Sequence, residues 1–153
     1  MITFQHVSFS YDSHGEQKTG QRTEDLQDIN LTVHDGECVL LTGKSGCGKT
    51  TMTRLVNGLV PHFYPGKLCG EVLLDGRNVS EMPMYETASL VGSVFQNPRM
   101  QFFNVDTDSE IAFGLENRAF PRERIVEKVA TAAKDLKIEN LRGRNIFSLS
   151  GGE

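Results

Sequence analysis

A glycine-rich stretch at residues 43–50, GKSGCGKT, combines the residue types that bind phosphate groups. Its glycines let the backbone turn tightly and direct successive N–H groups inward, where a Cβ atom would obstruct them. Lys49 can bridge the β- and γ-phosphates of a nucleoside triphosphate, and the Thr50 hydroxyl is an oxygen ligand suited to Mg²⁺. The pattern is therefore typical of a phosphate-binding loop. A glycine-rich turn with a chance lysine is the alternative, which the match at all four fixed positions of the motif disfavours.

The segments on either side of this loop match the context that the motif requires. The apolar run at 38–41 predicts a buried strand before the loop. Apolar residues recur at helical spacing between Met52 and Leu59, so a helix is predicted to run from Lys49 to about Asn57. The N-terminus of that helix adds roughly half a positive charge beside the phosphates. The residues expected to contact a nucleotide are Gly43, Lys44, Ser45, Gly46, Cys47, Gly48, Lys49, Thr50 and Thr51.

The composition is that of an ordinary globular chain of 153 residues, a length typical of one domain. A net charge of −4 provides no broad basic field, so we expect no nucleic-acid partner. The apolar fraction is 38%, and no run approaches the roughly 18 apolar residues of a membrane span. The N-terminus lacks the basic region and apolar core of a signal peptide. Three scattered cysteines indicate reduced thiols and a cytoplasmic protein.

The first part of the chain alternates between apolar and polar residues, as strands do. Residues 2–11 predict one strand with a bulge near His6, where the alternation slips. Residues 13–25 are polar and predict a surface loop. Residues 29–33 predict a second, half-buried strand, and the Asp-Gly pair at 35–36 predicts a tight turn. We therefore expect an antiparallel β part up to this turn.

Two further strands are predicted beyond the helix that follows the loop. Residues 72–74 form an apolar run that a turn at 75–76 ends. Residues 90–95 form a second apolar run, which stops at Gln96. In an α/β fold, ligands bind at the carboxyl ends of parallel strands, so Gln96 is a candidate site residue. A plain strand cap is the alternative interpretation of this glutamine.

Two helices are predicted in the last third of the chain. Thr107 and Glu110 form a capping box, in which the Thr107 oxygen accepts from the Glu110 N–H while the Glu110 carboxylate reaches back. Apolar residues then recur at helical spacing from Ile111 to Ala119. Pro121 opens the second helix, whose apolar face extends to residue 136.

The residues Leu-Ser-Gly-Gly-Glu at 149–153 add a second motif far downstream of the loop. In this order and spacing, the two motifs resemble those of the ATP-binding cassette (ABC) ATPases. Tyr11 stands where that family stacks an aromatic ring on adenine, and Gln96 stands where its glutamine contacts Mg²⁺ and the attacking water. The resemblance implies that the cofactors are ATP and Mg²⁺. It also implies Lys49 and Gln96 as catalytic residues, and Thr50 and Gln96 as metal ligands.

A second ATPase domain, identical or different, is a partner that the resemblance implies. Ser150, Gly151 and Gly152 would clamp the γ-phosphate held by that second domain, through an N-cap hydroxyl and backbone N–H groups. An ordinary helix N-cap and turn is the alternative for these three residues. For Tyr11, the alternative is a strand-end tyrosine whose ring packs on the core.

The stretches 94–103 and 111–117 resemble the ATPases of energy-coupling factor transporters, which import vitamins or transition-metal ions. That resemblance implies a transmembrane coupling subunit and a substrate-binding membrane subunit as partners, and a peripheral location on the cytoplasmic face of the cell membrane. Met100, Phe102 and Phe103 are expected to face the membrane partner, with a core position as the alternative. Two other functions stay open: a soluble ABC ATPase acting on ribosomes or DNA, and nucleotide binding without turnover.

The implied fold is an α/β P-loop NTPase fold with an antiparallel β subdomain, a parallel-sheet core and the start of a helical subdomain. The motif at 149–153 resembles the signature sequence of the ABC ATPases. Because the sequence ends inside this signature, we expect an incomplete domain without the family's aspartate strand, general-base glutamate and switch histidine. Hydrolysis by this chain alone should then be slow or nil, and the two central apolar strands should have unpaired edges. The expected parts are the antiparallel β part (1–36), the phosphate-loop strand and helix (37–60), the strands to Gln96 (70–98) and the helical part (105–153).

Cys47 lies inside the phosphate loop. The simplest interpretation is a small residue that fits the turn. Its position at a helix N-terminus also makes it a candidate reactive thiol, which a bound nucleotide would protect.

Overall fold

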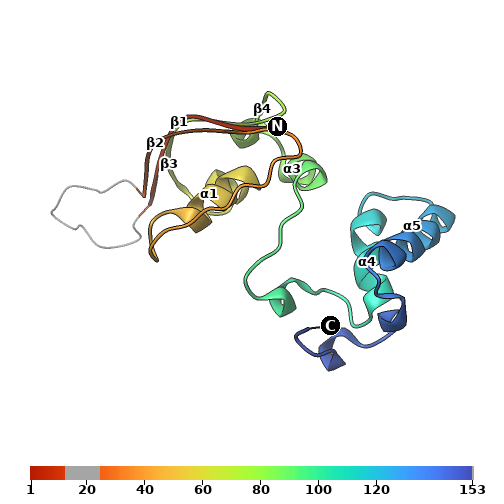
Figure 1. The fold of residues 1–153 in the computed structure, drawn as a ribbon. Coiled ribbons are helices and arrows are strands. Elements are labelled where there is room, and N and C mark those ends of the chain that lie inside the picture. The colour runs from red at the N-terminus through yellow and green to blue at the C-terminus, as the bar shows by residue number, and fades with distance from the viewer. Residues whose placement is uncertain (13–24, 153) are drawn as a thin grey trace. The chain divides into compact units, whose positions relative to one another are not determined.

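The structure is a computed structural model that describes residues 1–12 and 25–152 (Figure 1). The surface loop predicted at 13–25 therefore lies outside the described residues, apart from its last residue. The chain divides into two compact units, Met1–Ser93 and Val94–Glu153. None of the helices in the described ranges has the length and apolar character needed to cross a membrane.

An antiparallel sheet is the framework of the first unit. Within the described residues it contains β1 (Ile2–Tyr11), β2 (Leu26–Val33), β3 (Gly66–Leu74) and β4 (Arg77–Asn78), in the order β2-β1-β3-β4. Each neighbouring pair runs antiparallel. The register of β1 shifts against both neighbours near His6, whose φ is 50°, so the bulge expected there is confirmed.

One face of this sheet carries the core of the first unit. Helix α1 (Lys49–Val56) lies against it, as Figure 1 shows, and α2 (Leu59–His62), a short 3₁₀ turn (Val79–Glu81) and α3 (Met84–Leu90) follow. The apolar alternation of β1 explains the packing, because it turns alternate side chains toward Leu55 of α1. The buried core residues are Phe4, Val7, Phe9, Leu26, Leu55, Val60, Val72, Leu74 and Val79.

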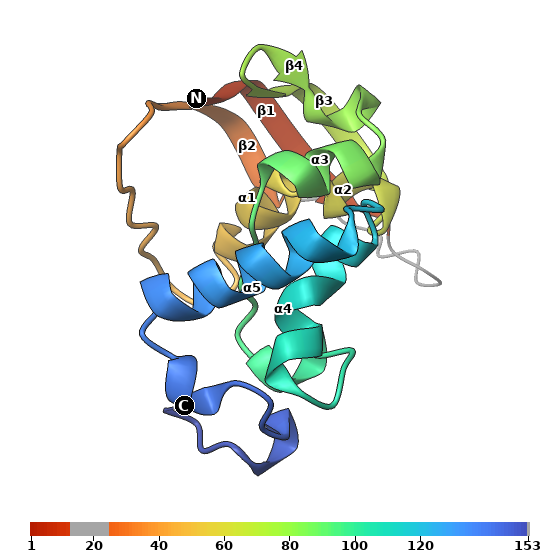
Figure 2. The same ribbon diagram turned by 90° about the vertical axis from the view of Figure 1, so that its right-hand side faces the viewer.

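The second unit is helical. Helices α4 (Thr107–Glu116) and α5 (Arg122–Asp135) lie side by side (Figure 2). Three 3₁₀ turns, Pro98–Gln101, Glu139–Leu141 and Ile146–Ser148, flank them. Among the residues of these helices, Ala112 of α4 and Ala133 of α5 are buried. The other buried residues of this unit are Thr107, Val129, Leu141 and Ile146.

The N-cap of α4 is Asp106, and the prediction of Thr107 is wrong by one residue. The Asp106 carboxylate accepts hydrogen bonds from the Ser109 N–H at 2.9 Å and the Ser109 hydroxyl at 2.7 Å. Thr107 is instead buried and donates its hydroxyl to the Leu141 carbonyl at 2.7 Å. The Glu110 carboxylate does reach back, but to the N–H groups of residues 103 and 104. A carboxylate interacts more favourably than a hydroxyl with the positive end of a helix.

The two apolar runs at 38–41 and 90–95 are not strands in the structure, contrary to the prediction. Residues 37–43 and 91–95 have no regular secondary structure, and Leu90 ends α3. The side chains of Leu40 and Val94 are 83% and 89% exposed. A strand exists only through hydrogen bonds to a neighbouring strand, and the sheet of the described residues offers none to either run. For the same reason this sheet contains no parallel pair, although a parallel core was expected.

Candidate nucleotide-binding site

The loop at 43–50 turns at glycines whose backbone no other residue would readily adopt. Gly43 and Gly48 have φ values of 148° and 91°. A Cβ atom at Gly43 would lie 2.6 Å from the Cys47 sulfur, and one at Gly48 would lie 3.0 Å from the Asp25 carbonyl oxygen. The first distance is too short for a carbon atom and the second is tighter than most such contacts, while the positive φ strains any other residue at both positions. The sequence therefore needs glycine at these two places to close the loop and begin α1.

Lys49 extends its ammonium group over the loop that precedes it. The Lys49 Nζ donates to the carbonyl oxygens of Gly43 and Lys44, each at 2.8 Å, and lies 3.5 Å from the Cys47 sulfur. A positive charge is thus fixed within a concave turn of backbone. Phosphate oxygens can replace the two carbonyl oxygens as acceptors for this ammonium group.

The N-terminus of α1 begins at the same loop. The first hydrogen bond inside the helix runs from the Met52 N–H to the Gly48 carbonyl oxygen at 2.9 Å. Helix geometry leaves the N–H groups of residues 48–51 directed out of this end. The first turn of α1 contains no acidic residue that would neutralise its partial positive charge. Residues 43–47 are exposed, so an anion has access to the loop from solvent.

Thr50 and Thr51 differ in their exposure, because Thr50 faces solvent and Thr51 faces the core. The Thr50 side chain is exposed next to Lys49, where its hydroxyl can serve as one oxygen ligand of a Mg²⁺ ion that phosphates and water complete. The residues in the described part of the chain form no cluster of three or more His, Cys, Asp or Glu side chains for a metal ion. Thr51 is buried, with its Oγ1 atom 3.2 Å from the Tyr11 hydroxyl. Any contact of Thr51 with a ligand is therefore made by its backbone.

Tyr11 ends β1 and lies against the first turn of α1. Its ring is half-buried and meets Phe9 and Tyr64 edge to face, with centroid distances of 4.8 and 6.4 Å. Its backbone N–H donates to the Asp25 carboxylate at 3.0 Å. The packing on the core agrees with the alternative interpretation of Tyr11. The hydroxyl contact with Thr51 nevertheless brings Tyr11 to the helix that carries the loop.

Arg54 is a site residue that the sequence did not reveal. Its Nη1 donates to the Tyr11 hydroxyl at 3.1 Å, and its guanidinium carbon lies 4.0 Å from the centre of the Tyr64 ring. The spacing of three residues from Thr51 places Arg54 on the same side of α1. Tyr64 belongs to an irregular segment before β3, and no local pattern predicted where its ring would lie.

The second unit contains the other predicted site residues. Gln96 is exposed, and the segment that includes it closes through a hydrogen bond from the Phe95 N–H to the Gln101 side chain at 3.0 Å. Ser150, Gly151 and Gly152 are exposed at the end of the described chain, where 151 and 152 form a turn. Arg99 donates to the Leu149 carbonyl oxygen at 3.5 Å, which connects the segment after Gln96 to the residue before Ser150. The structure thus keeps these residues in one unit and the phosphate loop in the other.

The cluster predicted to face a membrane partner is largely exposed. Met100 and Phe103 are 81% and 76% exposed, and Phe102 is half-buried. The Phe103 ring stacks on the Phe113 ring at 5.0 Å between centroids. A core position is therefore excluded for Met100 and Phe103.

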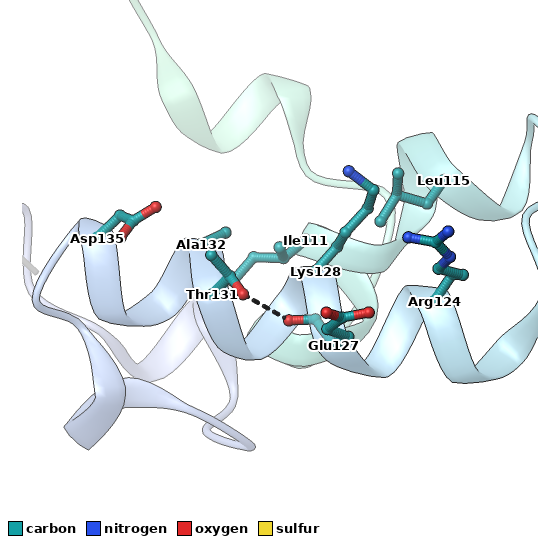
Figure 3. Close-up of a pocket in the computed structure, with 8 residues that line it drawn as sticks. All are labelled: Ile111, Leu115, Arg124, Glu127, Lys128, Thr131, Ala132 and Asp135. Atoms are coloured by element: carbon teal, nitrogen blue, oxygen red, sulfur yellow. Dashed lines mark hydrogen bonds between the residues drawn. The ribbon is translucent and has the colours of Figure 1, made fainter.

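A surface pocket on the second unit does not coincide with any predicted site residue. It lies between α4 and α5 (Figure 3), where the Thr131 hydroxyl donates to the Glu127 carbonyl oxygen at 2.9 Å. Its lining mixes apolar and charged side chains, namely Ile111, Leu115, Arg124, Glu127, Lys128, Thr131, Ala132 and Asp135. We take the loop at 43–50 and the neighbouring aromatic residues as the candidate site.

An exposed glycine loop that begins a helix, with a lysine folded over it, is typical of proteins that bind nucleotide phosphates. Comparison with known proteins narrows this class. The sequence profile of the ABC transporter family matches residues 26–153. An inferred ABC transporter ATP-binding protein of Treponema denticola is 52% identical over 153 residues, which are all of this chain and 30% of that protein. The inferred HMP/thiamine import ATP-binding protein YkoD of Bacillus subtilis is 38% identical, over 100% of this chain and 27% of its own length.

Solved structures agree with this comparison. The structure of cbiO1 from Clostridium perfringens, part of the ABC transporter complex cbiONQ, has a TM-score of 0.78 at 25% identity and covers 99% of this chain and 56% of cbiO1. The dimeric ATP-binding cassette MJ0796, bound to ADP and phosphate, matches with a TM-score of 0.75 at 23% identity. The match covers 99% of this chain and 64% of the MJ0796 chain. The chain belongs to the ABC transporter family of ATP-binding proteins. It spans about 30% of the length of the curated relatives that it matches first.

Proposed function

We propose that the full-length protein is the ATP-binding subunit of a membrane importer, which couples the binding and hydrolysis of MgATP to uptake of a solute. The observation that carries this proposal is the position of Lys49. Its ammonium group is fixed over the phosphate loop by two carbonyl oxygens at 2.8 Å, at the N-terminus of α1. Membership of the ABC transporter family supports the coupling to transport.

The loop would bind the phosphates through its backbone and through Lys49. The N–H groups at the start of α1 would donate to phosphate oxygens, while Lys49 would exchange its two carbonyl acceptors for oxygens of the β- and γ-phosphates. Thr50 would hold Mg²⁺, which when bound neutralises charge on the phosphates. Gln96 would contact the ion and orient the attacking water. Tyr11, 3.2 Å from Thr51 and so close to the loop, would receive the adenine on its ring.

The closed site would need two such domains. In this arrangement, Ser150, Gly151 and Gly152 of one domain meet the γ-phosphate bound to the loop of the other. Their exposure at the surface of the second unit leaves them accessible to a partner domain. The dimeric state named for the MJ0796 structure supports the proposal of an ATPase pair.

The importer would be of the energy-coupling factor type. The resemblance of residues 94–103 and 111–117 to this type favours a vitamin or a metal ion as the solute. The relative named as an HMP/thiamine importer supports uptake of a vitamin, and the structure named as part of the ABC transporter complex cbiONQ supports assembly into a transporter complex. The exposed Met100 and Phe103 would then contact a transmembrane coupling subunit, beside a substrate-binding membrane subunit. The protein would be peripheral, on the cytoplasmic face of the membrane.

Steady-state release of phosphate by the full-length protein tests this function. Lys49→Ala should lower the rate by roughly 100-fold or more, because it removes a charge that stabilises the transferred phosphoryl group. Lys134→Ala is a matched control, since Lys134 is exposed at the end of α5 in the other unit, and should leave the rate unchanged. Release that is absent in the wild-type protein, or equal in both variants, would contradict the proposed function.

A further inference from the structure

The guanidinium group of Arg54 connects two aromatic side chains beside the phosphate loop. It donates from Nη1 to the Tyr11 hydroxyl at 3.1 Å, and its central carbon lies 4.0 Å from the centre of the Tyr64 ring. The hydrogen bond to Tyr11 orients the planar guanidinium group, and the cation–π contact holds it over the Tyr64 ring. Arg54 therefore joins the end of β1 to α1, the helix that begins at the loop.

The Tyr11 hydroxyl is held from a second side by Thr51. Because an arginine side chain only donates, the Tyr11 oxygen accepts the bond from Arg54. The same hydroxyl shares a second hydrogen bond with Thr51 Oγ1 at 3.2 Å, in which either oxygen can be the donor. The Tyr11 ring lies nearly perpendicular to the rings of Phe9 and Tyr64. The Tyr11 ring is thus fixed by its hydroxyl as well as by its neighbours, and both hydroxyl partners come from α1.

We propose that Arg54 is a positioning residue of the nucleotide site, which orients the Tyr11 ring relative to α1 so that the ring receives the base while the loop holds the phosphates. The inference rests on the proposed function. Arg54 and Tyr11 are both half-buried, so their hydrogen bond is partly shielded from water and is assisted by the positive charge. A residue that only braced the fold would affect the binding of every ligand to the same extent.

The test compares MgATP with magnesium tripolyphosphate, which has the phosphates but no base. Binding of both is measured by titration calorimetry on the full-length protein. Arg54→Met keeps the length of the side chain and removes the charge and the donors. We expect it to weaken ATP binding about five- to tenfold, as part of the base-stacking contribution is lost, and to change tripolyphosphate binding less than about twofold. Equal weakening of both ligands, or of neither, would overturn the proposal.

Tyr11→Phe provides an independent variant that keeps the ring and its packing. This variant should weaken ATP binding by about the same factor as Arg54→Met and should leave the affinity for tripolyphosphate unchanged. The double variant Arg54→Met/Tyr11→Phe should lose no more ATP affinity than either single variant, because both changes remove the same hydrogen bond. Losses that add would contradict the proposal. Since Tyr11→Phe removes a single oxygen atom and with it the bond to Arg54, unchanged ATP affinity in this variant would overturn the proposal even if Arg54→Met does not fold.

Arg122→Met is the matched control, because Arg122 is exposed at the start of α5 in the second unit. It should change the affinity for neither ligand. A wild-type protein that binds neither ATP nor tripolyphosphate would refute the proposed function itself. A wild-type protein that binds both, with Arg54→Met acting equally on the two, would refute only the role of Arg54.

Discussion

At the scale of single residues, the loop depends on contacts that only certain side chains can make. Lys49 reaches back over the loop to the carbonyl oxygens of Gly43 and Lys44. Gly43 and Gly48 adopt backbone conformations that a Cβ atom would forbid. These requirements explain why four positions of the motif were enough to predict the loop from the sequence. No such requirement determines the residue at position 47, so the motif alone does not say whether the Cys47 thiol has a chemical role.

Cys47 should react with maleimide, and MgATP should protect it. Its thiol is exposed and lies 3.5 Å from the Lys49 Nζ, where a bound phosphate would cover it. Mass spectrometry after brief labelling measures this. Cys38 and Cys69 are also exposed and serve as internal controls, which should label equally with and without nucleotide. Labelling of Cys47 that MgATP leaves unchanged would exclude a nucleotide at the loop.

Two buried threonines of the first unit should respond in opposite ways to replacement by valine. Thr87 is fully buried, and its hydroxyl has no hydrogen-bond partner among the described residues, so Thr87→Val should be neutral or stabilise by up to about 1 kcal/mol. Thr51 is also buried, but its hydroxyl contacts Tyr11, so Thr51→Val should destabilise by about 1 kcal/mol. Urea denaturation measures both. A larger loss for Thr87→Val than for Thr51→Val would be inconsistent with these contacts.

At the scale of elements, periodicity predicted helices α1, α4 and α5 and missed α2 and α3, and it predicted the strands less well. Helix α4 ends at Glu116, before the predicted limit at Ala119. Helix α1 ends at Val56, with Asn57 as its C-cap, and α5 follows Pro121, as their apolar spacing and end signals indicated. The strand expected at 72–74 extends over Gly66–Leu74, because its polar first half pairs with β1 beyond the bulge. Such pairing depends on the partner strand, so the residues of β3 alone carried no sign of it.

The same dependence on a neighbouring strand explains why two apolar segments that were predicted as strands are irregular. Residues 38–41 and 90–95 are as apolar as buried strands, yet Leu40 and Val94 are exposed because no strand of the described residues lies beside them. An apolar pattern indicates which residues can be buried, but it does not identify the neighbouring strand or helix that would bury them. The contact of Arg54 with Tyr64 could not be predicted from the sequence either, because it joins a helix to an irregular segment whose path no local pattern indicates.

Helix α4 should show a pH-dependent contribution from its N-cap. Hydrogen bonds from the Ser109 N–H and hydroxyl lower the pKa of Asp106 below its ordinary value of 3.8. A lowered pKa in the folded state means that the stabilisation is complete above the unfolded pKa and is lost as the pH falls through the folded one. Asp106→Ala should therefore lower the melting temperature at about pH 7.

Thermal melts at about pH 7 and about pH 2 check the Asp106 prediction, and the gap between Asp106→Ala and wild type should narrow at the lower pH. Asp106→Asn is the matched control. It keeps a capping oxygen without the charge, and so should lose less than Asp106→Ala at neutral pH. An equal difference in melting temperature at both pH values would show that the charged carboxylate of Asp106 does not stabilise the N-terminus of α4.

At the scale of the whole molecule, the chain combines a unit that holds the phosphate loop with a helical unit that holds Gln96 and the signature residues 150–152. The structures of cbiO1 and MJ0796 each cover 99% of this chain, so both units follow one known fold. The sequence predicted the family because its motifs are local and their order is specific. No local motif of this kind names the transported solute, so the sequence predicted the class of protein and not its cargo.

The most direct measurement is calorimetric titration of MgATP into the full-length protein and its Lys49→Ala variant. The wild-type protein should bind with measurable heat, and Lys49→Ala should bind about 10- to 100-fold more weakly, the loss expected when charged hydrogen bonds to phosphate are removed. Absence of heat in the wild-type protein, or equal affinity in the two proteins, would contradict the claim that the loop at 43–50 holds the nucleotide phosphates.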